Sequence, residues 1–124
     1  MVNRLTTQDA AFYFLEAGTT PMHVGSLGIF RQLRNGIDHE ELLRLVEERL
    51  GSVPRYRQRV REVAFGLARP VWVDDSDFDI TYHVRRSALP KPGSDEQLMD
   101  LIARLTSRPL DSTRPLWRCT WSRG

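Results

Sequence analysis

Two segments with the spacing of amphipathic helices most constrain the fold of this 124-residue chain. The first is predicted to start at Asp38, where Glu41 completes a capping box, and to end at Gly51. The second is capped by Ser94, with Gln97 in the corresponding position, and stops before Pro109. Their predicted buried faces are Leu42, Leu45, Val46 and Leu50 in the first helix, and Leu98, Leu101, Ile102 and Leu105 in the second.

The N-terminal region predicts a third helix followed by a strand. The helix begins near Thr6 or Thr7, is almost wholly apolar after its first turn, and stops at Gly18, so we expect it to be well buried. A turn around Pro21 leads into Val24 to Arg31, which has the pattern of an inner strand. The sequence "RNG" then predicts a turn before the next helix.

Three further strands are predicted from side-chain alternation. A short one covers Val71 to Val73, and the last runs from Pro115 to Ser122. Between them, Phe78, Ile80, Tyr82 and Val84 alternate on one side of a strand that is broken at Pro90, Pro92 and Gly93. The elements together predict one mixed α/β (α+β) domain over residues 1–124.

Composition excludes several classes of partner and compartment. The net charge of +2 comes without a basic helix or aromatic platform, so we expect no nucleic-acid binding. No apolar run is long enough for a transmembrane segment. The first residues do not resemble a secretory signal, which predicts a cytoplasmic location. The single cysteine, Cys119, lies on an apolar strand face and is predicted to be a small buried hydrophobic residue.

No complete catalytic set is recognisable among the residues. His39 is predicted to lie on the surface and His23 to be structural at the start of a buried strand, while His83 is either solvated or paired. No serine or cysteine occurs in a nucleophile-elbow motif. We therefore assign no catalytic residue.

A metal site is not expected either. Asp75, Asp77 and Asp79 match the first ligand positions of a calcium-binding loop, but Ile80 replaces the required glycine and Arg86 the required glutamate. A solvated acidic turn is the better interpretation. Zinc-type clusters of cysteine and histidine are missing from the sequence, so we predict no metal and no bound cofactor.

An arginine stripe is the one candidate anion site. If residues 53–63 are extended, Arg55, Arg57, Arg59 and Arg61 lie on one face. One guanidinium group can bind two phosphate oxygens at once, so the stripe suits a nucleotide-bearing substrate. The alternative is a strand face that is solvated or internally paired.

Several stretches, in the same order and spacing, resemble the N-terminal part of the bacterial wax ester synthase/diacylglycerol acyltransferase family. They are "RLTTQDAAFYFLEAGTTPMHVGSLGIF", "VPRYRQRV", "RPVWVDDSDFDITYHVRRSALPKPGSDEQLMDLIARLTSRPLD" and "RPLW". The resemblance covers nearly the whole chain. It implies a partial N-terminal lobe of a chloramphenicol acetyltransferase-like fold, which is a CoA-dependent acyltransferase fold.

The resemblance also implies a chemistry. Such enzymes transfer a long-chain acyl group from acyl-CoA, as substrate, to diacylglycerol or a fatty alcohol, using the second histidine of a His-His-x-x-x-Asp-Gly signature as general base. No His-His pair occurs in this sequence, so the chain is predicted to be truncated before that signature. Pro115, Leu116 and Trp117 correspond to a substrate-channel or structural motif, and Arg55, Arg57 and Arg59 become candidates for CoA phosphate binding.

The missing signature leaves three interpretations of the function. A second polypeptide supplies the catalytic part, and this chain is inactive alone. Alternatively, the chain is a non-catalytic module that binds acyl-CoA, lipid droplets or a full-length paralogue, or else a pseudogene product. For the first two interpretations we expect a location at the periphery of membranes or lipid droplets.

Overall fold

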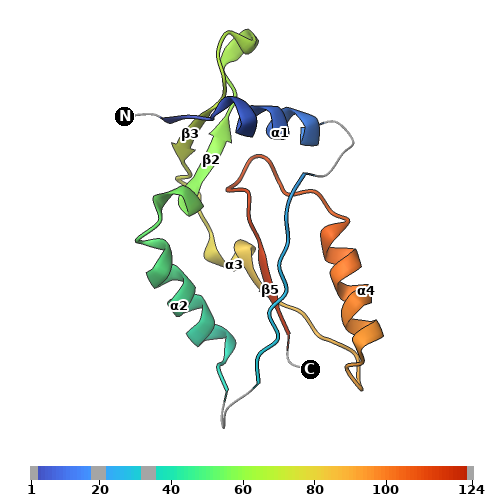
Figure 1. Cartoon of the computed structure of the whole chain (residues 1–124). Coiled ribbons are helices and arrows are strands. Elements are labelled where there is room, and N and C mark those ends of the chain that lie inside the picture. The colour runs from blue at the N-terminus through green and yellow to red at the C-terminus, as the bar shows by residue number, and fades with distance from the viewer. Residues whose placement is uncertain (1–2, 18–21, 32–35, 123–124) are drawn as a thin grey trace.

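The computed structural model, which describes residues 3–17, 22–31 and 36–122, contains two small sheets and the helices that flank them (Figure 1). In chain order the elements are β1 (Asn3–Arg4), α1 (Thr7–Ala17), α2 (His39–Leu50), the 3₁₀ turn η1 (Pro54–Arg57), β2 (Gln58–Arg61), the 3₁₀ turn η2 (Ala64–Gly66), β3 (Val71–Asp74), α3 (Ile80–His83), β4 (Val84–Arg86), α4 (Asp95–Thr106) and β5 (Cys119–Trp121). The chain is a mixed α/β unit, as predicted.

The first sheet has the strand order β1-β3-β2, and both pairs are antiparallel. The β2–β3 hairpin places Val60 opposite Trp72, and the Leu5 amide continues the β1 edge by donating to the Pro70 carbonyl at 2.9 Å. Buried Leu5, Ala10 and Val60 form the core beneath α1, and Tyr13, Trp72 and Leu116 pack against them.

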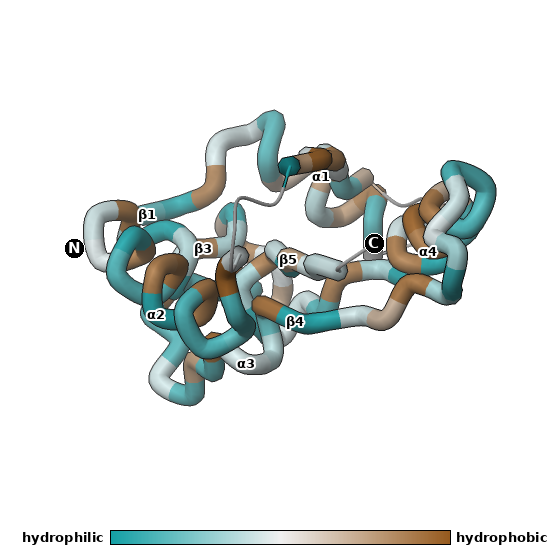
Figure 2. Tube along the Cα trace, turned by 90° about the horizontal axis from the view of Figure 1, so that it is seen from below, coloured by the Kyte–Doolittle hydropathy of each residue, from teal (hydrophilic) through white to brown (hydrophobic). Residues whose placement is uncertain are grey.

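The second sheet is the parallel pair β4–β5, with Val84 opposite Cys119. Parallel strands need a crossover connection, and α4 lies in that connection. In both views α2 and α4 lie on opposite sides of this pair (Figures 1 and 2). Val84 is fully buried there, and the pairing continues where the Ser87 amide donates to the Trp121 carbonyl at 2.9 Å.

Both capping-box helices form as predicted. The Asp38 carboxylate accepts from the Glu41 amide at 2.8 Å, and Ser94 Oγ accepts from the Gln97 amide at 3.2 Å, each with its reciprocal bond. Figure 2 shows hydrophobic and hydrophilic residues alternating along α2 and α4. Leu50 and Leu101 are buried, whereas Leu45 is 43% exposed, contrary to its predicted place on the buried face.

The prediction that α1 is well buried is wrong. The helix begins as expected, with Thr6 Oγ1 accepting from the Asp9 amide at 3.1 Å. Yet Phe12, Phe14 and Leu15 are exposed, because only the side that carries Ala10 faces the core. The predicted stop at Gly18 and the turn at Pro21 lie outside the described residues.

The segment from Val24 to Arg31 is not a strand. It pairs with no strand of the described chain, and Val24 and Phe30 are almost fully exposed. Without a neighbouring strand its backbone has no ladder to join, so the apolar pattern alone gives no sheet. Of the predicted "RNG" turn only Gly36 is described, with a φ of 66°.

The predicted strand from Phe78 to Val84 is also wrong in its first part. Asp79 Oδ1 accepts hydrogen bonds from the Thr81 amide at 3.0 Å and the Thr81 hydroxyl at 2.6 Å, which caps the single-turn helix α3. Strand pairing therefore begins only at Val84. The last strand is shorter than predicted as well, because the Trp117 amide donates to the Pro115 carbonyl and delays β5 to Cys119.

None of the helices in the described ranges is long and apolar enough to cross a membrane.

Candidate functional site around His83 and Trp117

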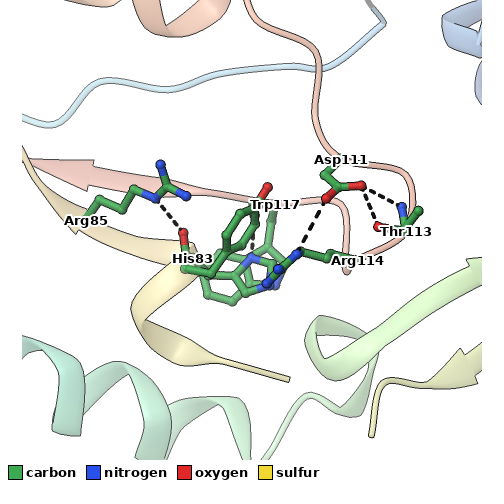
Figure 3. A network of polar contacts seen from close by, with 7 residues as sticks. His83, Arg85, Asp111, Thr113, Arg114 and Trp117 are labelled. Carbon is green, nitrogen blue, oxygen red and sulfur yellow. Dashed lines mark hydrogen bonds and ion pairs between the residues drawn. The ribbon is translucent and has the colours of Figure 1, made fainter. Parts of the chain in front are cut away.

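An aromatic cluster around His83 joins α3 to the segment before β5. Of the two predicted alternatives for His83, a solvated or a paired side chain, the solvated one is wrong, because His83 is 1% exposed. Its ring stacks on Trp117, with centroids 4.6 Å apart and planes at 20°, and on Phe78, at 5.2 Å and 14°. Tyr82 meets the same ring edge-on at 5.0 Å. Figure 3 shows the contact between His83 and Trp117.

A hydrogen bond fixes the tautomer of His83. Its Nδ1 lies 2.7 Å from the Trp117 carbonyl oxygen, and since a carbonyl only accepts, Nδ1 carries the proton. Burial lowers the pKa of His83, and the nearby Arg114 cation lowers it further, while the bond to Trp117 and the charges of Asp75 and Asp79 act in the opposite direction. The imidazole is therefore neutral at pH 7, with its lone pair on Nε2.

Of the predicted motif residues, Pro115 is buried, and Leu116 and Trp117 are half-buried. Leu116 packs against the core beneath α1. The Trp117 indole donates to the Tyr56 carbonyl at 2.8 Å, and the two rings meet edge-on at 5.7 Å. Trp117 thus connects η1, α3 and the approach to β5, through contacts suited to a structural role.

The arginine stripe does not form the single extended face that the sequence suggested. Arg55 and Arg57 belong to the 3₁₀ turn η1, which begins at Pro54, whereas Arg59 and Arg61 lie in β2. Proline fixes φ near the helical value, which favours the turn at this point. Alternation along β2 puts Arg59 and Arg61 on the face opposite the buried Val60.

Arg55 and Arg57 instead lie over aromatic rings. The Arg55 guanidinium is 4.4 Å from the centroid of Trp72, and that of Arg57 is 5.1 Å from the centroid of Phe78. Both side chains remain exposed. Stacking on a ring face leaves the N–H groups at the guanidinium edge available to an anion.

Two more arginines, which sequence reasoning missed, flank Tyr82. Arg114 lies 3.9 Å and Arg85 4.7 Å from the ring centroid, and Arg85 Nε donates to the Tyr82 carbonyl at 2.8 Å. Asp111 Oδ2 lies 3.5 Å from Arg114 Nε (Figure 3). Hydrogen bonds from Thr113 hold the pKa of Asp111 below its usual value.

The sequence did contain a signal for the turns near this second pair of arginines. The pattern Asp-x-Thr occurs at Asp79 and again at Asp111, and each aspartate accepts from the amide and hydroxyl of the threonine two residues later. This turn also lowers the pKa of Asp79, mainly through the Thr81 hydroxyl. Each motif marks a sharp change of chain direction near the aromatic cluster.

Two other sequence predictions need correction. His39 is not a simple surface residue, because it is half-buried, stacks on Trp121 and accepts a hydrogen bond from the Trp121 indole at Nδ1, 3.0 Å away. Cys119 is exposed rather than buried, since its side of β5 is uncovered in the described chain. Partial desolvation nevertheless raises the pKa of the Cys119 thiol, which keeps it protonated at neutral pH.

His23 makes the contacts of a structural residue, although the strand it was expected to precede does not form. Its Nε2 lies 2.9 Å from the Thr106 carbonyl oxygen at the end of α4. Its Nδ1 lies 3.7 Å from Glu16 Oε1 on α1. These contacts link the segment that follows α1 to two helices.

No metal-binding group was found in the described ranges. Within them, no three histidine, cysteine, aspartate or glutamate side chains lie close enough to share an ion. Of the predicted calcium-loop residues, Asp75 accepts from the Asp77 amide at 3.0 Å and Asp79 is engaged by Thr81. These carboxylates stabilise local turns.

The cluster around His83 is a packed arrangement of aromatic rings. His83 is covered by two rings and tied to a backbone carbonyl, and no hydroxyl or thiol nucleophile is bonded to it in the described chain. The cluster can fix the relative positions of η1, α3 and β5. Exposed arginines around it offer positive charge at the surface.

Comparison with known proteins gives a consistent result. The profile of the wax ester synthase/diacylglycerol acyltransferase catalytic domain matches residues 5–121. A probable diacylglycerol O-acyltransferase, tgs3, from Mycobacterium tuberculosis is 67% identical over 117 residues, covering 94% of this chain and 43% of the relative. The probable diacylglycerol O-acyltransferase tgs1 of the same species is 44% identical over 118 residues, covering 94% of this chain and 25% of the relative.

A solved structure supports the same conclusion at the level of the fold. The wax ester synthase/diacylglycerol acyltransferase from Marinobacter aquaeolei VT8 superposes with a TM-score of 0.75 at 30% identity, covering 98% of this chain and 31% of that one. The chain therefore spans less than half the length of each of these proteins, and its fold corresponds to part of a larger lobe.

Proposed function

Because this chain belongs to the wax ester synthase/diacylglycerol acyltransferase family, we propose that it is the N-terminal part of an enzyme that transfers an acyl group from acyl-CoA to an alcohol. The observation that carries the proposal is the family match over residues 5–121. Diacylglycerol is the favoured acceptor, since the relatives named above are called diacylglycerol O-acyltransferases. A fatty alcohol is the alternative acceptor.

In the proposed reaction the acceptor hydroxyl attacks the thioester carbonyl, a base takes its proton, and the CoA thiolate leaves. The sequence has no His-His pair to supply that base. His83 is an unsuitable substitute, because it is 1% exposed and stacked on two aromatic rings. We therefore assign the base to polypeptide outside residues 1–124 and a positioning role to Pro115, Leu116 and Trp117.

An acyl-transfer assay tests this division of labour. Residues 1–124 are incubated with palmitoyl-CoA and diacylglycerol, alone and together with a polypeptide that carries the remaining part of a related acyltransferase. General-base catalysis contributes about 100- to 10,000-fold, so we expect no transfer above background for the chain alone and measurable transfer for the combination. Transfer by the isolated chain at the rate of the combination would contradict the proposal.

We also propose that Arg55, Arg57 and Arg59 bind the phosphates of CoA. Support comes from their positive charge and from the exposed guanidinium groups of Arg55 and Arg57. Titration with palmitoyl-CoA should give saturable binding that weakens when the three arginines are replaced by glutamine. Arg44→Gln on the exposed side of α2 is the matched control and should bind like the parent. Equal losses in both proteins would refute the assignment.

A non-catalytic binding module is the second candidate function. The apolar side chains left exposed on α1, which are Phe12, Phe14 and Leu15, favour it, because such surfaces mark interaction sites. Palmitoyl-CoA binding without any acyl transfer, even with the remaining lobe supplied, would select this alternative. For either function we propose a cytoplasmic protein at the periphery of membranes or lipid droplets.

A further inference from the structure

The tip of the β2–β3 hairpin presents two large apolar side chains to solvent. Phe65 is 96% exposed and Leu67 is 81% exposed. The hairpin projects past α1 at one end of the molecule (Figure 1). The other strongly exposed apolar residues, such as Phe30, belong instead to the segment that runs along the body of the molecule.

The backbone at this tip is held in an unusual conformation. Phe65 has φ 61° and ψ 16°, and Gly66 has φ 64°. Hairpin turns with positive φ at both central residues prefer asparagine, aspartate or glycine at the first of them. A bulky side chain at this position costs free energy. Packing of Phe65 does not offset that cost within the described chain, because the side chain is almost fully exposed. The arrangement therefore points to a contact made outside this domain.

Positive charge lies at the base of the same hairpin. In the first sheet, Val71 on β3 lies between Arg4 on β1 and Arg61 on β2. Arg69 follows the tip, and its backbone carbonyl accepts from Arg4 Nη1 at 3.0 Å. Glu62 is the acidic residue of this loop. Burial raises the pKa of Tyr13 on α1, and the Glu62 carboxylate raises it further. Three arginines thus accompany one carboxylate below the apolar tip.

We infer that the hairpin tip inserts Phe65 and Leu67 into a phospholipid surface that carries anionic headgroups. The inserted side chains bury apolar area, and the arginines at the hairpin base meet the headgroup charges. Two side chains on a narrow loop offer far less area than the roughly 1,000 Å² of a stable protein interface, whereas a lipid surface can accept a single inserted ring. The inference rests on the proposed peripheral location and names the part of the chain that makes the contact.

Co-sedimentation with lipid vesicles tests the inference without any acyl transfer. The 124-residue chain is mixed with phosphatidylcholine vesicles, with and without phosphatidylglycerol as a minority lipid. We expect stronger binding to the anionic vesicles. Phe65→Asn should lower that binding about 10- to 100-fold, which is the effect of removing one buried large apolar side chain. Asparagine tolerates positive φ, so this variant keeps the turn and should fold at least as well as the parent, as circular dichroism would verify.

Two further variants make the result specific. Phe30→Asn removes an equally large side chain that is 91% exposed but lies away from the tip, and it should bind like the parent. Arg61→Gln should weaken binding to the anionic vesicles about fivefold and leave binding to pure phosphatidylcholine unchanged. Equal losses for Phe65→Asn and Phe30→Asn, or no vesicle binding by the parent, would overturn the inference. A change of oligomeric state in Phe65→Asn would overturn it too, because the tip would then contact a second copy of the chain.

Discussion

Replacing His83 by phenylalanine should destabilise the chain and reduce the pH dependence of its free energy of unfolding between about pH 8 and about pH 5. Phenylalanine retains a ring between Phe78 and Trp117 but has no Nδ1–H to donate to the Trp117 carbonyl. Leaving a buried acceptor without its donor costs about 1–3 kcal/mol. For a domain of this size that loss corresponds to a decrease of roughly 1 M in the midpoint of urea unfolding.

The pH dependence of the free energy of unfolding follows from the lowered pKa of His83. As pH falls below the ordinary histidine value of 6.5, the unfolded chain takes up a proton before the folded chain does. The free energy of unfolding is therefore highest above that pH and decreases as the pH falls toward the folded pKa. A chain with phenylalanine at this position lacks the titrating group and loses that contribution.

Urea unfolding followed by tryptophan fluorescence measures both effects. His83→Asn is the matched comparison, because its side-chain amide can still donate to the Trp117 carbonyl but does not titrate. Both variants should show a smaller pH dependence than the parent, and only His83→Phe should leave the carbonyl unpaired. The reasoning fails if the parent chain has the same midpoint of urea unfolding at about pH 8 and at about pH 5. It also fails if His83→Phe keeps the whole pH dependence of the parent.

Three further predictions concern individual hydrogen bonds. Asp38→Ala removes the N-cap of α2 and should lower the free energy of unfolding by about 1 kcal/mol in urea titrations, whereas Asp38→Asn, which can still cap, should lower it less. Trp117→Phe deletes the donor to the Tyr56 carbonyl and should cost about 0.5–1.5 kcal/mol; an unchanged midpoint would show that this bond adds nothing to stability. A double-mutant cycle of His39→Ala and Trp121→Phe should give a coupling energy of about 0.5–1 kcal/mol, and strict additivity would contradict the hydrogen bond between the two side chains.

The helices with capping boxes could be predicted from the sequence because their signals are local. Asp38 and Ser94 each form both reciprocal bonds within four residues, so no distant segment is needed to define where α2 and α4 begin. The strands were harder to predict, because a strand forms only where a second segment of the chain pairs with it. Val24 to Arg31 has a strand-like pattern and no paired neighbour in the described chain, and Asp79 closes a turn within a stretch that alternates like a strand.

The candidate site was only partly predictable for the same reason. The importance of Trp117 followed from the family motif, and its contacts with Tyr56 and His83 became visible only in the folded chain. The burial of His83 comes from rings that approach it from Phe78 and from the segment before β5, which alternation along one strand cannot reveal. The arginine stripe separated into two groups because Pro54 favours a turn over a continuous strand.

The contacts of β5 and the segment before it have a consequence for synthesis on the ribosome. The Trp121 indole bonds to a residue 82 positions earlier, the Trp117 indole to one 61 positions earlier, and the Trp117 carbonyl to His83, 34 positions earlier. Forming contacts at such separations closes long loops, and the entropy lost in closing them opposes folding until the contacts are made. The nascent chain can preform α2 and the β2–β3 hairpin, but the buried site of His83 is completed only after Trp117 has left the exit tunnel. Until then the aromatic surface that becomes the interior of the cluster is exposed to chaperones and to aggregation.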